Sequence, residues 1–580
     1  MSQNTTDQYF KSTVLGHPAG LFVLFFTEMW ERFSYYGMRA LLVLFLTSSL
    51  MDEGWGWPRE HAMALFGSYV GLVYLSTMMG GYFADKIIGF RWAVVVGAAL
   101  MTLGHASMAF ETQCSIYIGL GLLVIGNGFF KPNMTSIISE MYKDRPEKKD
   151  GAYTIFYMGV NSGAFLGIIL CGYLGEQIGW SLGFGLAGIF MFFGLIQFWL
   201  AQNIFGDIGL KPKKDITSLA QELDVDKRVP FTSWQLALIL LMVILGLLWI
   251  INAPATTISD GEINIFSFLG ANGNTIAILT ALGLFLILLI YRFTQYSKIT
   301  AQKLIAVSFF ALLSVFFWAI FEQSPGTLTI FANDYTDRSL NGTSANIFRI
   351  VNAAMVVVPL GIITWVLFLL FKQTFAKYKW ANLTLSLSFL IVWIITIWML
   401  SNQFNDTNLE IPASWFSSLN SLYIITLAPL FSKWWESKYN PSANVKYGVG
   451  MAFLGLGMAC IAFGAMGIEP GAKTASVSII WLILVYLFHT MGELCISPVG
   501  LSYVSKLVPA RMIAFMFGVW YLAIAIGMKL AGVFGENVDR IANENGISYF
   551  FWMLTIISLL VAVLSIVMTP VIKKLMHGVR

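Results

Sequence analysis

The sequence predicts an all-α polytopic membrane protein, and three observations support that prediction. Of its 580 residues, 57% are hydrophobic and only 11% are charged, whereas a soluble protein carries about a quarter charged residues. The hydrophobic residues gather in long blocks such as 236–251 and 277–290. A helix needs about 20 apolar residues to cross a bilayer. Basic residues also cluster between alternate blocks, as a membrane orientation signal requires.

About sixteen segments are long enough to cross. They lie near 18–48, 61–82, 91–110, 114–138, 152–174, 182–202, 234–252, 274–293, 303–327, 348–371, 380–400, 414–436, 447–467, 476–500, 510–533 and 548–571. The polar stretch 203–233 separates the first six from the rest and is expected to be a cytoplasmic linker. Six spans before a central linker indicate a transporter built from two halves.

The charge of the loops predicts the orientation. Basic residues concentrate in the loops near 86–91, 143–149, 211–228, 292–298, 372–379, 433–446, 506–511 and 573–580. The loops between these are richer in acids, near 52–53, 111, 176, 260–262, 334–337, 406–410 and 536–539. Because basic loops stay inside, both termini are expected to be cytoplasmic. The first span lacks a cleavage site and is expected to be retained.

Several other chemistries are not expected. The four cysteines, Cys114, Cys171, Cys460 and Cys495, have no metal-ligand or redox spacing. His489 and Glu493 stand four residues apart without an evident third ligand, so no metal site is expected. No Gly-Lys dipeptide occurs, which excludes a Walker A nucleotide site. We therefore expect no cofactor and no nucleic-acid partner, and transport energy must come from a gradient, with protons as the coupling ion.

A charged stripe interrupts the first span. Residues 28–39 read EMWERFSYYGMR, and each charge near a bilayer centre costs roughly 2.5–3.5 kcal/mol. On a helix, the set Glu28, Glu31, Arg32, Tyr35, Tyr36 and Arg39 falls within a sector of roughly 140°. This face is expected to line a wet central cavity. The alternative is an ion-paired stripe that only joins helices.

Three more ionisable residues lie inside predicted spans: Lys131, Glu322 and Glu493. Charges within membranes usually mark ion or substrate pathways and pair with one another. With the stripe, the set contains four acids and three bases, so one added proton would balance it. If all seven share a cavity, this arithmetic predicts a proton site.

These motifs resemble those of the proton-dependent oligopeptide transporters, the POT/PTR branch of the major facilitator superfamily. The similar stretches are EMWERFSYYGMRALL, GNGFFKPN (126–133), FYMGVNSGAF (156–165), FWAIFEQS (317–324), PASWFSSLN (412–420) and GELCISPVGLS (492–502). The resemblance implies two six-helix halves plus an extra helix pair, which the spans near 234–252 and 274–293 fit. The expected division is 1–202, 203–298 and 299–580.

The resemblance also implies roles for individual residues. Proton coupling would involve Glu28, Glu31, Arg32 and Glu322. The peptide carboxylate would meet Arg39 and Lys131, with Arg32 nearby, and the α-ammonium would be held by Glu493, Asn161 and Asn420. The side-chain pockets would be lined by Tyr35, Tyr36, Tyr74 and Trp520. Glu322 would pair with Lys131 or Arg39, and its protonation would release the pair. A zwitterion needs a cation at one end and an anion at the other, which suits this set.

Three features depart from the family pattern. Residues 340–411 insert two apolar segments between the seventh and eighth core helices, expected to form a peripheral hairpin that touches lipid or a partner. Asn420-Ser421 stands where the family often has Asn-Pro. Animal members carry a histidine within the second span, whereas His61 lies at its edge, so coupling must rest on carboxylates.

The expected function is proton-coupled symport of di- and tripeptides into the cytoplasm by alternating access. One alternative is a related carrier for a drug, nitrate or a modified peptide. Another is a non-transporting receptor or a membrane enzyme, although no nucleophile–base pair and no large soluble domain is evident. The protein is expected to work as a monomer in the lipid bilayer of a bacterial inner membrane.

Overall fold

The chain folds almost entirely into helices. A computed structural model describes residues 12–211, 230–270, 272–508 and 513–578. Among these residues the strands are pairings of two residues in loops. The middle of the predicted linker, 212–229, lies outside the described residues, as do the chain ends 1–11 and 579–580.

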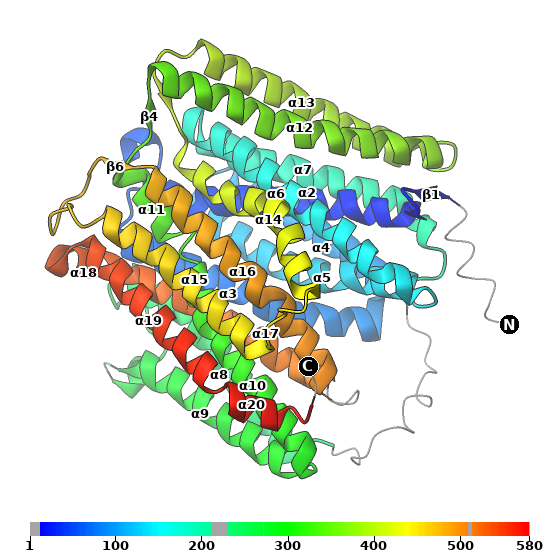
Figure 1. The fold of residues 1–580 in the computed structure, drawn as a ribbon, viewed down its shortest axis with the longest axis vertical. Helices are drawn as coiled ribbons and strands as arrows, with labels where there is room; N and C mark the ends of the chain where they lie inside the picture. Colours follow the sequence, from blue (N-terminus) through cyan, green and yellow to red (C-terminus); the bar gives the residue numbers. More distant parts are fainter. Residues whose placement is uncertain (1–11, 212–229, 271, 509–512, 579–580) are drawn as a thin grey trace.

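The N-terminal half consists of six long helices (Figure 1). They are α2 (Ala19–Thr47), α3 (Arg59–Phe83), α4 (Phe90–Met108), α5 (Gln113–Met141), α6 (Lys149–Gln177) and α7 (Trp180–Ala201). The charged helix α2 packs along α6 and α7. A Cβ added to Gly167 of α6 would lie 2.2 Å from the carbonyl oxygen of Phe33. Glycine at this position therefore lets the two backbones approach closely.

Six further helices form the C-terminal half. They are α10 (Lys298–Phe321), α14 (Ser418–Glu436), α15 (Ala443–Gly464), α16 (Ile480–Leu507), α17 (Ile513–Glu536) and α19 (Ile547–Val567). Ser297 caps α10, since its hydroxyl accepts the Thr300 N–H. The helix ends at Phe321, earlier than the predicted span near 303–327. Residues 322–326 form a turn instead, because Pro325 disfavours the helical conformation in the residue before it.

The two halves meet along two helix pairs. Helix α3 packs against α17, and α6 packs against α14. The two backbones of the first seam approach closely at Gly67 and Gly532, where a Cβ on Gly67 would stand 2.5 Å from the other Cα. No larger residue fits there without separating the helices.

Helices α8 (Ser233–Ile258) and α9 (Gly273–Thr294) follow the linker and form a hairpin. Its turn, which contains η5 (Ser267–Leu269), is closed by the Asn252 side chain. That amide donates to Asn264 Oδ1 at 3.1 Å and to Asn274, and its oxygen accepts the Ile265 N–H at 2.7 Å. The hairpin lies beside α3, where Ile250 covers Gly71.

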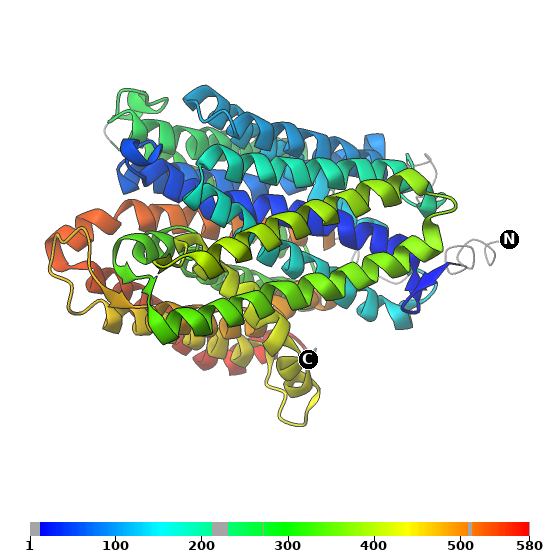
Figure 2. The same cartoon turned by 90° about the horizontal axis from the view of Figure 1, so that it is seen from above.

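Helices α12 (Gly342–Thr374) and α13 (Lys379–Asn405) form the second hairpin. It interrupts the sequence of the C-terminal half, yet α13 packs against α7 of the N-terminal half. The Phe389 ring lies 5.6 Å from Phe26 and 5.3 Å from Trp30 between centroids. Figure 1 shows the hairpin along one edge of the molecule, and Figure 2, seen from above, shows it in front of the other helices. The inserted segments thus lie peripherally, on the back of the helix that carries the charged stripe.

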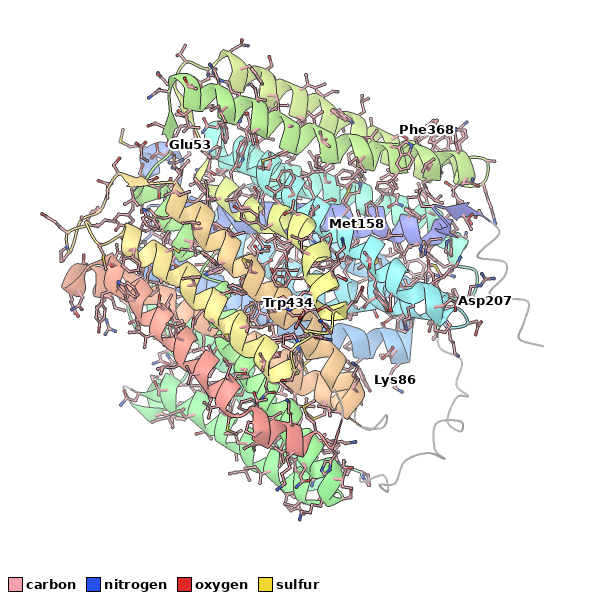
Figure 3. All side chains as sticks on the ribbon, in the orientation of Figure 1. Glu53, Lys86, Met158, Asp207, Phe368 and Trp434 are labelled. Atoms are coloured by element: carbon pink, nitrogen blue, oxygen red, sulfur yellow. The ribbon has the colours of Figure 1, made fainter. Side chains whose placement is uncertain are left out.

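Short elements gather at the two ends of the bundle. The outer end holds η1 (Leu50–Asp52), α11 (Thr327–Asp334), β3 (Thr336–Asp337), β4 (Ser339–Leu340), β5 (Leu409–Glu410), η6 (Ala413–Ser417), β6 (Val477–Ser478) and α18 (Val538–Asn545). The inner end holds β1 (Thr13–Val14), β2 (His17–Pro18), η2 (Ala84–Ile88), η3 (Pro146–Lys148), η4 (Gln202–Phe205) and α20 (Thr569–Leu575). Figure 3 labels Glu53 at the outer end and Phe368 and Asp207 at the inner end. We call the end with the acidic loops the outer end and the end with the basic loops the inner end.

Each predicted span corresponds to one long helix of the structure. Thirteen described helices are long and apolar enough to cross a membrane. The helices α2, α4 and α14 fall outside that set. For α2 the reason is its four charges, because every window of 18 residues within it contains at least three of them. These charged residues, which belong to the predicted site, thus lower the hydropathy of α2.

Candidate functional site

Two acids flank one base in the middle of α2. Arg32 Nε lies 2.8 Å from Glu28 Oε1 and 2.9 Å from Glu31 Oε2. The amide of Asn127, from α5, donates to Glu31 Oε1 at 3.0 Å. All three charged side chains are buried. The cluster carries one more negative than positive charge when its acids are ionised, so a proton would neutralise it.

A cavity lies between the two halves. Its volume is about 130 Å³, roughly ten times what the centre of one water molecule needs. Seven of the predicted site residues line it: Tyr36, Arg39, Tyr74, Asn161, Glu322, Asn420 and Glu493. They come from α2, α3, α6, α14, α16 and the end of α10, so both halves contribute charged groups to the same space.

Arg39 and Glu322 form an ion pair across the two halves. The guanidinium carbon of Arg39 also lies 5.7 Å, 5.6 Å and 5.9 Å from the ring centroids of Tyr35, Tyr36 and Phe66. Aromatic faces at this distance stabilise a cation that has lost water. Glu322 caps the C-terminal end of α10. Three aromatic rings thus surround the base in addition to its acidic partner.

Glu493 is a second acid on the cavity wall. Its Oε2 accepts from Asn420 Nδ2 at 2.9 Å, and the same amide lies 3.1 Å from Thr490 Oγ1. Among the described residues no base lies within ion-pair distance of Glu493. Asn161, on the facing helix α6, donates to the Tyr157 carbonyl at 2.9 Å. The acid thus has an amide donor and unfilled capacity for a cation.

Lys131 lies behind the wall of the cavity. Its Nζ is 4.3 Å from the ring centroid of Tyr74, which does line the cavity. No carboxylate of the described residues lies within 4.0 Å of Lys131. Glu322 thus pairs with Arg39 and not with Lys131 in this state. The surrounding helix α5 continues through Pro132 without a break.

Other predicted residues also lie away from the cavity. Glu28, Glu31 and Arg32 form their own buried cluster. Tyr35 is buried edge-on to Tyr36, with 5.2 Å between ring centroids. Trp520 is buried on α17 and does not line the cavity in this conformation.

Four large aromatic side chains line the cavity and were not predicted: Tyr157, Trp318, Phe321 and Tyr486. Helical spacing carried the signal for three of them. Tyr157 and Trp318 lie four residues before Asn161 and Glu322, and Tyr486 lies seven residues before Glu493. Side chains at these intervals share a helix face. Tyr486 Oη donates to the Ser324 carbonyl at 3.1 Å.

The halves are joined by polar contacts at the outer end. Arg59 of α3 lies 2.5 Å from Asp334 Oδ2 and 2.7 Å from Asp539 Oδ1. Glu176 of α6 accepts the backbone N–H groups of Ala413 and Ser414 at 2.7 Å and 2.9 Å. These contacts hold the two halves together at the outer end.

Comparisons with known proteins agree with this geometry. The family model described as "POT family" matches residues 91–392 and 380–553. The peptide transporter YePEPT of Yersinia enterocolitica is 31% identical over 545 residues, 92% of this chain and 91% of that protein. A di-/tripeptide transporter of Lactococcus lactis is 28% identical over 98% of this chain and 99% of its own. The crystal structure of a peptide transporter POT in complex with sulfate has a TM-score of 0.70 at 28% identity, covering 99% of both chains. The chain belongs to the POT family.

Proposed function

We propose that the protein is a secondary active transporter that carries di- and tripeptides into the cytoplasm together with protons. One observation carries this proposal: the cavity between the halves is lined both by the Arg39–Glu322 pair and by Glu493 with Asn420. A peptide zwitterion needs a cation for its carboxylate and an anion for its ammonium. The names of the peptide-transporting relatives support the same substrate class.

The proposed switch is electrostatic. Glu322 is paired with Arg39. Protonation of Glu322 removes its charge, and the peptide carboxylate then takes its place beside Arg39. The ammonium group meets Glu493, while aromatic and small side chains between the two ends accept varied peptide side chains. Binding of proton and peptide is thereby coupled at one base.

The cluster of Glu28, Glu31 and Arg32 is the second proton-coupling element of the proposal. One arginine balances only one of the two acids, so the second gains most from a proton. Asn127 remains hydrogen-bonded to Glu31 in this state. Changes in this pairing would reach the cavity along α2, because Tyr36 and Arg39 lie one and two turns further on the same face.

A proton gradient supplies enough energy for accumulation. A peptide zwitterion adds no net charge, so each proton moves one charge inward, worth ~2.3 kcal/mol per 100 mV. A pH step of one unit adds ~1.4 kcal/mol. Together, roughly 3.7 kcal/mol per proton sustains an accumulation of several hundred-fold.

Alternating access requires the outer contacts to break and the inner end to close. The Arg59 cluster and the Glu176 contacts with η6 are the proposed outer gate. We further infer a bacterial inner membrane, cytoplasmic termini and a functional monomer. The bacterial relatives and the basic inner loops support the first two inferences.

Uptake by purified protein in proteoliposomes tests the function. Labelled dialanine should accumulate under an imposed acid-outside gradient, and a protonophore should abolish the accumulation. Empty liposomes provide the control for leakage. No uptake above that control would refute peptide transport by this chain, and uptake that ignores the protonophore would refute proton coupling.

A smaller zwitterion is the second candidate substrate. One similar solved structure, 26% identical with a TM-score of 0.71, is a POT family transporter in complex with 5-aminolevulinic acid. That molecule also bears a carboxylate and an ammonium. Competition against labelled dialanine separates the candidates, because peptides should displace the label at lower concentration than 5-aminolevulinic acid if peptides are the substrate.

A further inference from the structure

A second cavity lies at the inner end, between the turn of the α12–α13 hairpin and the N-terminal half. Its volume is about 200 Å³. The hairpin contributes Gln373, Thr374, Lys377 and Tyr378, and Ser12 lies on the facing side with apolar residues from the ends of α2, α5 and η4. Figures 1 and 2 both show β1 beside this turn. The cavity exists only because the inserted hairpin crosses to the other half.

The polar lining of this cavity favours an anion. Lys377 supplies a positive charge, and no carboxylate of the described residues lines the space. Ser12 and Gln373 add uncharged polar side chains to the wall. A lysine ammonium and an amide N–H both donate to phosphate oxygens.

The backbone adds to the same preference. Helix α2 begins at Ala19 and α13 begins at Lys379, and neither has a side-chain cap at its N-terminus. Pro18 and Gly20 at the start of α2, and Tyr378 before α13, all line the cavity. The N-terminal ends of helices carry partial positive charge and donate N–H groups to anions.

The surroundings indicate a lipid. Lys372 lies 4.5 Å from the Phe368 ring and Lys379 lies 5.8 Å from the Trp380 ring. Lysines paired with exposed aromatic side chains are typical of the boundary between headgroups and acyl chains. Phe368 and Trp380 are 53% and 69% exposed, so an apolar surface leads away from the polar cavity along the hairpin.

We propose that this cavity binds the phosphate of an anionic phospholipid from the inner leaflet. Lys377 and the Gln373 amide donate to the phosphate oxygens, and the acyl chains lie against the hairpin. The lipid bridges the hairpin to the ends of α2 and α5. The hairpin is thereby held to the N-terminal half by a ligand as well as by the Phe389 contacts.

Native mass spectrometry of the full-length protein tests this site without any measurement of transport. The probes are phosphatidylglycerol and phosphatidylcholine with identical acyl chains. Wild-type protein should bind one phosphatidylglycerol at least fivefold more tightly than phosphatidylcholine, since one basic residue contributes about a fivefold preference, or ~1 kcal/mol. Equal binding of the two lipids would overturn the proposal.

Two variants and a matched control locate the site. Lys377→Gln should weaken phosphatidylglycerol binding about fivefold, and Gln373→Ala about two- to tenfold because it removes one hydrogen bond. Lys438→Gln removes an exposed lysine just after α14, over the Tyr439 ring at 5.0 Å, that does not line the cavity, and it should bind as wild type does. An equal loss in the Lys438 variant, or no loss in the other two, would overturn the assignment. Displacement by millimolar glycerol 3-phosphate would also overturn it, in favour of a soluble phosphate.

Discussion

Replacing Glu322 with Gln is expected to mimic the proton-loaded state of the cavity. The side chains of Glu322 and Arg39 are only 3% and 7% exposed. Removing one partner of a buried pair leaves the other charge uncompensated and costs about 3–5 kcal/mol. Empty Glu322→Gln should therefore melt at lower temperature than wild type, and dialanine should raise its melting temperature more, because the peptide carboxylate replaces the missing charge.

The affinity change follows from the same contact. At alkaline pH the wild-type peptide must displace Glu322 from Arg39, whereas the variant offers the base at every pH. A hydrogen bond to a charged group contributes about 1.5–3 kcal/mol, so dialanine should bind Glu322→Gln roughly ten- to hundredfold more tightly than wild type at alkaline pH. In acid the two affinities should converge.

Calorimetric titration with dialanine across pH measures this difference, and proteoliposomes measure its consequence. Glu322→Gln should retain exchange of preloaded peptide but lose gradient-driven accumulation. Glu536→Gln is the matched control, since it removes another acid paired with a base, Lys529 at 3.4 Å, away from the cavity. Wild-type pH dependence in the Glu322 variant, or unchanged accumulation, would refute the switch.

Three further substitutions test the packing and the outer gate. Arg59→Gln should add a population with separated outer ends, seen as a longer distance between spin labels on η1 and α18; an unchanged distribution would contradict the gate. Gly67→Ala places a Cβ 2.5 Å from the opposing helix and should slow transport, whereas Gly121→Ala faces open space and should not. Equal transport rates in the two variants would contradict the close packing of α3 against α17. Phe389→Ala should destabilise the protein by about 3–5 kcal/mol and lower its melting temperature far more than Ile394→Ala on the exposed face; equal melting would contradict the docking of the hairpin.

The sequence alone could predict the helices and the charged set. Long apolar blocks and basic loops are local signals, and a charge inside such a block stands out because of its cost. Glu28, Glu322 and Glu493 could therefore be found without a structure. An acidic side chain within a predicted membrane span was sufficient evidence for each of them.

The partners of these charges could not be predicted in the same way. The resemblance left Lys131 and Arg39 open as partners of Glu322, because both are bases in neighbouring helices. The structure pairs Glu322 with Arg39, while Lys131 lies over Tyr74. Which base is nearer depends on how two halves lie against each other, and no local spacing encodes that relation.

The position of the hairpin was also beyond local signals. Residues 340–411 have the hydropathy of two spans, which predicts their existence and their turn. Their docking depends on Phe389 meeting Phe26 and Trp30, more than 350 residues earlier. Apolar residues in a membrane helix face lipid and protein alike, so hydropathy does not say which neighbour they choose.

In the proposed function a peptide lies in the cavity with its ammonium group at Glu493 and its carboxylate at Arg39. The most direct measurement compares binding of dialanine, N-acetyl-dialanine and dialanine amide to wild type and to Glu493→Gln. Wild type should bind both blocked analogues at least about tenfold more weakly, since each lacks one charged contact. Glu493→Gln should lose its discrimination against the acetylated peptide and keep its discrimination against the amide. If the variant still rejects the acetylated peptide as strongly as wild type does, the ammonium group lies elsewhere and the account is wrong.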